Sequence, residues 1–165
     1  MQINLSLLSI NSRSPYQVQS GNGYSFSFKT RFGHTYEVGF TEDYMLSDDG
    51  LIFQFFITCL DTEHPQKDTR VRDTITIILE EFFTNESVCL VYICDTHDGR
   101  QSARQRLFAS WFSQYHLRDQ YMFSEKCLRL DGIQYFVSFI CRMDNPYLAD
   151  REQALDELYG RIIEK

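Results

Sequence analysis

The residues best suited to chemistry are gathered in one short segment that joins an apolar run to a pattern of helical spacing. In order, the segment carries Asp95, His97, Asp98, Arg100, Gln101, Arg104 and Arg106. Amide groups and the positive end of the helix dipole make the start of a helix receptive to anions. We therefore expect a ligand-binding surface for a small anion or a protein partner, formed by Asp95, Asp98, Arg100, Gln101 and Arg104.

Two other interpretations of this segment stay open. In the structural one, Asp98 caps the helix, Gln101 completes a capping box and Asp95 satisfies amides of the loop. In the catalytic one, Asp95, His97 and Asp98 hold a metal ion for a hydrolase. Because two carboxylates and one histidine do not define a metal, the sequence predicts no metal site and the hydrolase ranks last.

A buried strand and an amphipathic helix must position these side chains. Residues 88–94 are apolar at nearly every position, which is typical of an interior strand covered on both faces. Gly99 suits the turn that follows. Beyond it, apolar residues recur at helical spacing and predict one wide aromatic face, made of Ala103, Leu107, Phe108, Trp111, Phe112 and Tyr115.

The remaining elements are read from alternation, helical spacing and turn residues. Further strands are expected at residues 16–19, 24–29, 35–40, 51–60, 121–130 and 133–141. Helices are expected at residues 69–83, after a cap at Asp68 or Thr69, and from Asn145-Pro146 onward. Asp131-Gly132 predicts a two-residue hairpin.

The fold class that follows is α+β, with a mixed, mostly antiparallel sheet of about six or seven strands and three helices. The expected order is β-β-β-α-β-α-β-β plus a C-terminal helix. Residues 1–15 are expected to be a leader or an edge strand around Leu5 to Ile10, and residues 16–165 one domain.

Composition limits the classes of function. The chain has 165 residues and a net charge of −7, which disfavours non-specific nucleic-acid binding. Its 5 cysteines lie in apolar runs without a Cys-x-x-Cys motif, as expected for reduced thiols of a cytoplasmic protein. No run approaches the ~20 apolar residues of a membrane span. A homodimer is compatible with these data.

The central segment resembles a family of small uncharacterised bacterial proteins with the signature C-D-x-x-D-G-R-Q…L-F…W-F. The matching positions are Cys94 to Gln101, Leu107-Phe108 and Trp111-Phe112. The resemblance covers most of the chain after about Tyr16 and implies no established activity.

The element order from Tyr24 to Cys141 is also similar to GNAT-type acyl-CoA-dependent N-acyltransferases. That resemblance implies a phosphate-binding turn at residues 66–71, but Gln66-Lys67-Asp68-Thr69-Arg70-Val71 lacks the expected glycines. Phe108 replaces the tyrosine that often acts as general acid, and it cannot donate a proton.

We therefore expect a degenerate, non-catalytic binding or interaction module that needs no cofactor. The alternative is an N-acyltransferase using acetyl-CoA or another acyl-CoA, with the phosphates held by Lys67, Arg70 and Arg72. Its general base would be Glu37 or Asp95, and its acid Tyr92 or Tyr115.

Overall fold

The computed structural model describes residues 3–163, except for the side chains of residues 158, 159 and 161–163. Seven strands form one mixed sheet in the order β1-β2-β3-β4-β5-β7-β6, so the α+β prediction is confirmed. The strands are β1 (Val18–Ser20), β2 (Tyr24–Lys29), β3 (Thr35–Glu42), β4 (Ile52–Cys59), β5 (Cys89–Ile93), β6 (Tyr121–Leu130) and β7 (Ile133–Arg142). The helices are α1 (Leu7–Arg13), α2 (Thr69–Phe82), α3 (Gln101–Gln114) and α4 (Leu148–Ile163), with the 3₁₀ turn η1 at Arg118–Gln120.

The N-terminal segment is helical, so the edge strand expected around Leu5 to Ile10 was wrong. Ser6 precedes α1 and its side chain accepts a hydrogen bond from the Ser9 amide at 3.2 Å. Ile10 is fully buried, and its contacts decide the conformation of a run whose apolar residues also fit alternation. This helix raises the number of α-helices among the described residues from the expected three to four.

The residues fall into two compact units, which are described separately. The first comprises residues 1–41 and 55–85. Its antiparallel strands β1, β2 and β3 pair in register, with Phe26 opposite Val38. Helix α2 contributes Phe82, whose ring stacks on Phe40 at 4.4 Å between centroids, while α1 is tied to α2 by an ion pair between Arg13 and Glu80. The alternating residues of β3 therefore supply the core, as the pattern predicted.

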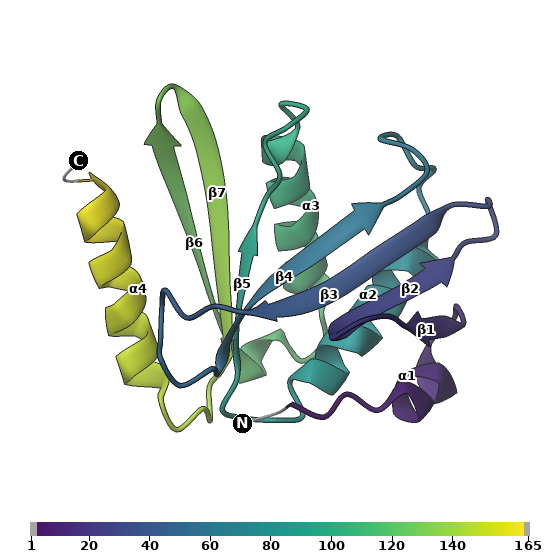
Figure 1. The fold of residues 1–165 in the computed structure, drawn as a ribbon, viewed down its shortest axis with the longest axis horizontal. Coiled ribbons are helices and arrows are strands. Elements are labelled where there is room, and N and C mark those ends of the chain that lie inside the picture. Colours follow the sequence, from purple (N-terminus) through teal and green to yellow (C-terminus); the bar gives the residue numbers. More distant parts are fainter. Residues whose placement is uncertain (1–2, 164–165) are drawn as a thin grey trace. The chain divides into compact units, whose positions relative to one another are not determined.

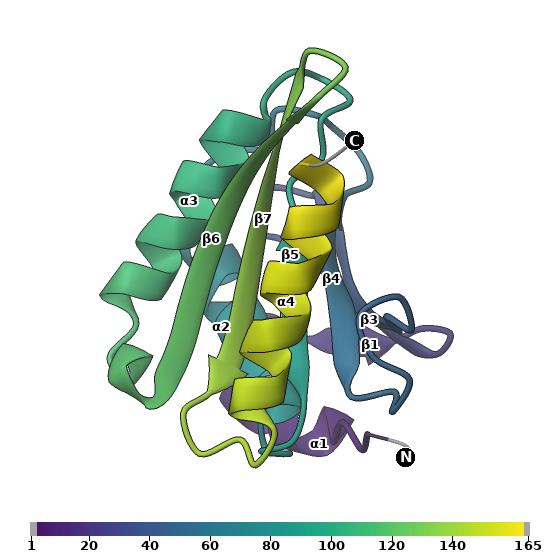
Figure 2. The ribbon, with the colours of Figure 1, turned by 90° about the vertical axis from the view of Figure 1, so that its left-hand side faces the viewer.

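The second unit comprises residues 42–54 and 86–165. Helices α3 and α4 lie on opposite sides of its strands β5, β7 and β6 (Figures 1 and 2). Each face of β5 packs against a different helix. Val91 belongs to a buried cluster with Leu155 of α4, whereas Tyr92 packs on Phe108 of α3. A strand with helices on both sides reads as continuously apolar.

The hairpin of β6 and β7 forms as predicted, with Leu130 opposite Ile133. Asp131 and Gly132 have φ values of 51° and 78°, the left-handed pair that a two-residue hairpin turn requires. Strand β6 ends the sheet and exposes Glu125, Lys126 and Arg129.

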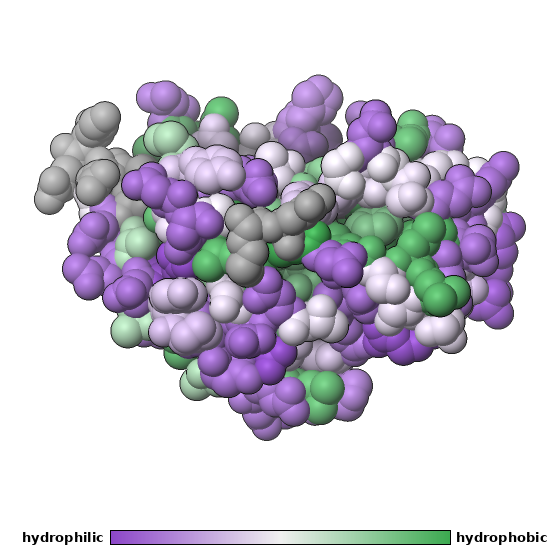
Figure 3. Space-filling view, turned by 60° about the horizontal axis from the view of Figure 1, so that its bottom comes forward, coloured by the Kyte–Doolittle hydropathy of each residue, from purple (hydrophilic) through white to green (hydrophobic). Residues whose placement is uncertain are grey.

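The surface combines polar and apolar residues. The face in Figure 3 is mostly hydrophilic, with hydrophobic side chains gathered in smaller areas. Among the described residues, Leu8 and Met45 are large apolar side chains that are mostly exposed, at 84% and 89%. Over residues 3–163, no helix combines the length and the apolar character needed to cross a membrane.

Candidate functional site

The loop between β5 and α3 is held by an ion pair within the second unit. Both guanidinium Nη atoms of Arg104 donate to the carboxylate of Asp98 at 2.6 Å, and Nη1 also donates to the Asp95 carbonyl at 2.9 Å. A two-pronged contact of this kind fixes orientation as well as charge. The loop is therefore anchored to the first turns of the helix that it precedes.

Asp98 does not act as the helix cap, so the predicted capping box was wrong. Helix α3 begins at Gln101 after Arg100, whose side chain makes no capping hydrogen bond. Asp98 lies two residues before the N-cap position at Arg100, and its carboxylate instead accepts hydrogen bonds from the Arg100 amide at 3.1 Å and from the Arg104 guanidinium. The turn predicted at Gly99 is confirmed by its φ of 71°.

The neighbouring guanidinium changes the acidity of this carboxyl group. The hydrogen bonds from Arg104 hold the pKa of Asp98 well below its usual range, and the Arg100 amide adds to the effect. The pKa of Arg104 is raised in return, chiefly by Asp98. Asp98 is therefore ionised at neutral pH, and its charge is balanced inside the loop.

Gln101 spans from the helix start to β7. Its Nε2 donates to the Gln134 carbonyl at 3.1 Å, whereas its Oε1 is buried without a hydrogen-bond partner. His97 is exposed, and its amide donates to the Asp95 carboxylate at 3.0 Å. The five predicted ligand residues thus lie together along the loop and the first turn of α3.

The predicted catalytic residues are placed less favourably. Tyr92 is buried at 8% exposure, and desolvation raises the pKa of its hydroxyl well above the usual value, which makes it a poor acid. Tyr115 follows the last residue of α3, at the other end of the helix from Gln101. Glu37 lies on β3, half-buried in the first unit.

The five cysteines differ in how deeply they are buried. Cys89, Cys94 and Cys141 are buried thiols, Cys59 is half-buried and Cys127 is exposed. Burial raises the pKa of the Cys94 thiol to about 11, which disfavours the thiolate that a nucleophile needs. The Sγ atoms of Cys89 and Cys141, on facing positions of β5 and β7, lie 2.7 Å apart.

The start of α2, in the first unit, carries the cofactor residues predicted from the GNAT resemblance. Asp68 caps this helix, accepting from the Arg70 amide at 3.0 Å, and the Tyr16 hydroxyl also donates to it. Lys67 and Arg70 are exposed. Arg72 forms an ion pair with Asp73 at 3.0 Å.

One further group of possible ligands was missed by sequence reasoning. His34, Cys59 and Asp61 each offer a donor atom, and these atoms lie within 4.8 Å of one another. Cys59-x-Asp61 at the end of a strand was a partial signal, but His34 joins it only through the pairing of strands.

The fold is α+β with a mixed sheet. The chain belongs to the family of unknown function DUF6169, which it matches over residues 67–157. This match includes the loop at Asp95 to Arg104 and agrees with the expectation of an uncharacterised domain. No curated protein matches the chain.

Proposed function

We propose that the protein is a non-catalytic binding module with a GNAT-like order of elements. The order β2-β3-β4-α2-β5-α3-β6-β7 followed by α4 supports the likeness to that fold. The observation that carries the proposal is the position of Asp68. Its carboxylate already occupies the start of α2, where an acyl-CoA-dependent enzyme of this kind would bind the pyrophosphate of its cofactor.

A fixed carboxylate disfavours a phosphate at the same place for two reasons. It repels the negative charge, and it accepts the hydrogen bond of an amide that would otherwise donate to the phosphate. Opening the site would also deprive the Tyr16 hydroxyl of the acceptor that it has in Asp68. Buried Phe108, packed on Tyr92 with 4.5 Å between ring centroids, offers no proton for a leaving group.

The ligand that best fits the loop before α3 is a small anion that also carries a hydroxyl group. The helix dipole attracts an anion at the start of α3, and the Arg100 guanidinium at the N-cap position adds a positive charge there, which the Asp95 carboxylate of the same loop opposes in part. The buried Gln101 Oε1, which lacks a partner, would accept a hydrogen bond from such a hydroxyl. Hydrogen phosphate has both features.

Titration with inorganic phosphate, followed by amide NMR, tests the proposed ligand. We expect saturable shifts for residues 100–103 that are lost in Arg100→Ala. They should persist in Arg118→Ala, a matched control, because Arg118 lies in η1, after the C-terminal end of α3. Shifts of equal size in both variants, or none in the wild type, would refute the site.

Acetyl-CoA discriminates between the proposal and the acyltransferase alternative. A ligand at 100 times its Kd stabilises a folded protein by about 2.7 kcal/mol, so binding in the micromolar range must raise the melting temperature. We expect no rise at millimolar acetyl-CoA. A rise that is lost when Lys67, Arg70 and Arg72 are replaced by alanine would favour the acyltransferase and overturn the proposal.

A further inference from the structure

Three side chains of different chemistry converge in the first unit, and none of them belongs to the loop before α3. His34 lies in the turn between β2 and β3, Cys59 is the last residue of β4 and Asp61 follows two positions later. Their nitrogen, sulfur and oxygen donors lie within 4.8 Å of one another. His34 and Cys59 are half-buried and Asp61 is exposed, so the group is open to solvent on one side.

Two hydrogen bonds with Thr30 hold the His34 segment of this group. The Thr30 amide donates to the His34 carbonyl at 2.8 Å, and the His34 amide donates to the Thr30 hydroxyl at 3.2 Å. The turn that presents the imidazole is therefore closed on itself and does not depend on a ligand for its conformation.

The segment with Cys59 and Asp61 is tied to the same turn. The Leu60 amide donates to the Thr35 carbonyl at 2.8 Å, and the Thr35 amide donates to the Asp61 carboxylate. A backbone amide that orients a ligating carboxylate is the kind of outer contact that tunes metal sites. The residues beside His34 thus fix the other two donors.

The types of donor select the ion. Magnesium and calcium prefer oxygen ligands alone, whereas imidazole, thiolate and carboxylate together suit zinc. Zinc bonds of 2.0–2.3 Å place tetrahedral donors about 3.5 Å apart. A group spread over at most 4.8 Å closes to that spacing by rotation of side chains.

We propose that His34, Cys59 and Asp61 bind Zn²⁺ through one nitrogen, one sulfur and one oxygen atom. A water molecule completes the tetrahedron on the side where Asp61 is exposed. The ion crosslinks the β2–β3 turn to the segment after β4. This proposal is independent of anion binding before α3, because the two sites share no residue.

Titration of the metal-free chain with Co²⁺ tests the site, because a cobalt–thiolate bond absorbs strongly in the near ultraviolet. We expect one equivalent of Co²⁺ to produce this band and Zn²⁺ to bleach it. Cys59→Ser should abolish the band. His34→Ala and Asp61→Asn should each weaken binding by at least about tenfold, as losses at metal sites do.

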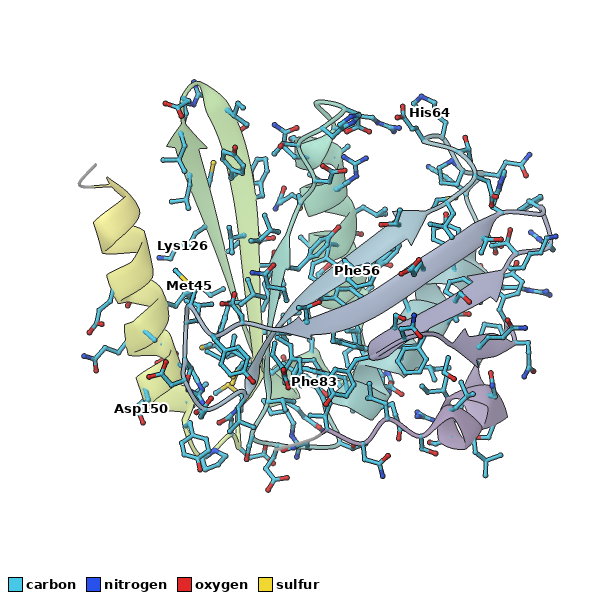
Figure 4. The ribbon with its side chains drawn as sticks, viewed as in Figure 1. Met45, Phe56, His64, Phe83, Lys126 and Asp150 are labelled. Atoms are coloured by element: carbon cyan, nitrogen blue, oxygen red, sulfur yellow. The ribbon has the colours of Figure 1, made fainter. Side chains whose placement is uncertain are left out.

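Two matched controls come from the chain itself. Cys127→Ser removes an exposed thiol of the second unit, and His64→Ala removes an imidazole of the loop after Asp61 (Figure 4). Both should bind Co²⁺ like the wild type, and circular dichroism should show every variant folded. A band that survives Cys59→Ser, one that requires Cys127, or no band at micromolar Co²⁺ would overturn the proposal.

Discussion

The N-termini of α2 and α3 differ in how the preceding aspartate is used. Each helix follows a polar connection with an aspartate shortly before its first residue. Asp68 turns to the helix and caps it, whereas Asp98 turns to Arg104 and α3 begins without a side-chain cap from its N-cap residue. The difference teaches that a carboxylate two residues before the N-cap position can bind a guanidinium of the first helical turn and a loop amide together, without capping the helix.

Removing the N-cap of α2 should give the largest decrease in the free energy of unfolding. Asp68→Ala loses the bond to the Arg70 amide and leaves the Tyr16 hydroxyl without this acceptor, so we expect a loss of about 1–2 kcal/mol. Urea unfolding measures it. Asp68→Asn should keep most of the stability, since asparagine caps equally well. Equal losses in both variants would contradict the role of Asp68 as a cap.

Substitution of Gly99 in the turn before α3 should give the next largest loss of stability. Gly99→Ala places a side chain at a φ of 71°, and an added Cβ would meet no atom within 4 Å. The expected loss is therefore conformational alone, about 1 kcal/mol. Gly160→Ala, inside α4, is the control, and it should increase stability because alanine favours a helix. A neutral Gly99→Ala would show that the loop does not hold this conformation.

The pair of Asp98 and Arg104 should give a smaller effect on stability than the cap of α2, since its members are near solvent. We expect Asp98→Ala and Arg104→Ala to be non-additive, because either change removes the same contact. A double-mutant cycle in urea measures the coupling. Strict additivity would mean that the pair does not form in solution.

The pH dependence of that pair should give the smallest effect. Because the folded pKa of Asp98 is depressed, its contribution is fully present above the unfolded pKa of about 3.9. It is lost as the pH falls through the folded value. Carbon NMR of the Asp98 carboxyl should show this low pKa, and Arg104→Gln should return it towards 3.9. An unchanged pKa in that variant would exclude Arg104 as the cause.

Local patterns predicted most of the fold because they report burial directly. The alternation in residues 35–40 matches the buried Tyr36, Val38 and Phe40 of β3, and Asp131-Gly132 gave the hairpin. The prediction of a wide aromatic face on α3 was only partly correct, since Leu107 is 52% exposed and Phe108 is the one buried residue of this helix. Periodicity locates a face but does not show how much of it finds a partner.

The candidate sites were less predictable because their contacts compete or span the sequence. Asp98 and Gln101 have the spacing of a capping box, but nothing in that spacing shows that Arg104 takes the carboxylate. His34 meets Cys59 and Asp61 only after β3 and β4 have aligned, and a single sequence does not give that register.

The long outer strand β6 has a consequence for how the chain is handled. The amide and carbonyl groups on the outer edge of β6 can form hydrogen bonds with a strand from another molecule. Glu125, Lys126 and Arg129 put charges along this border, and burying them between two molecules would cost free energy. These charges disfavour edge-to-edge association of two molecules, so neutral replacements at these positions would promote aggregation of a concentrated sample.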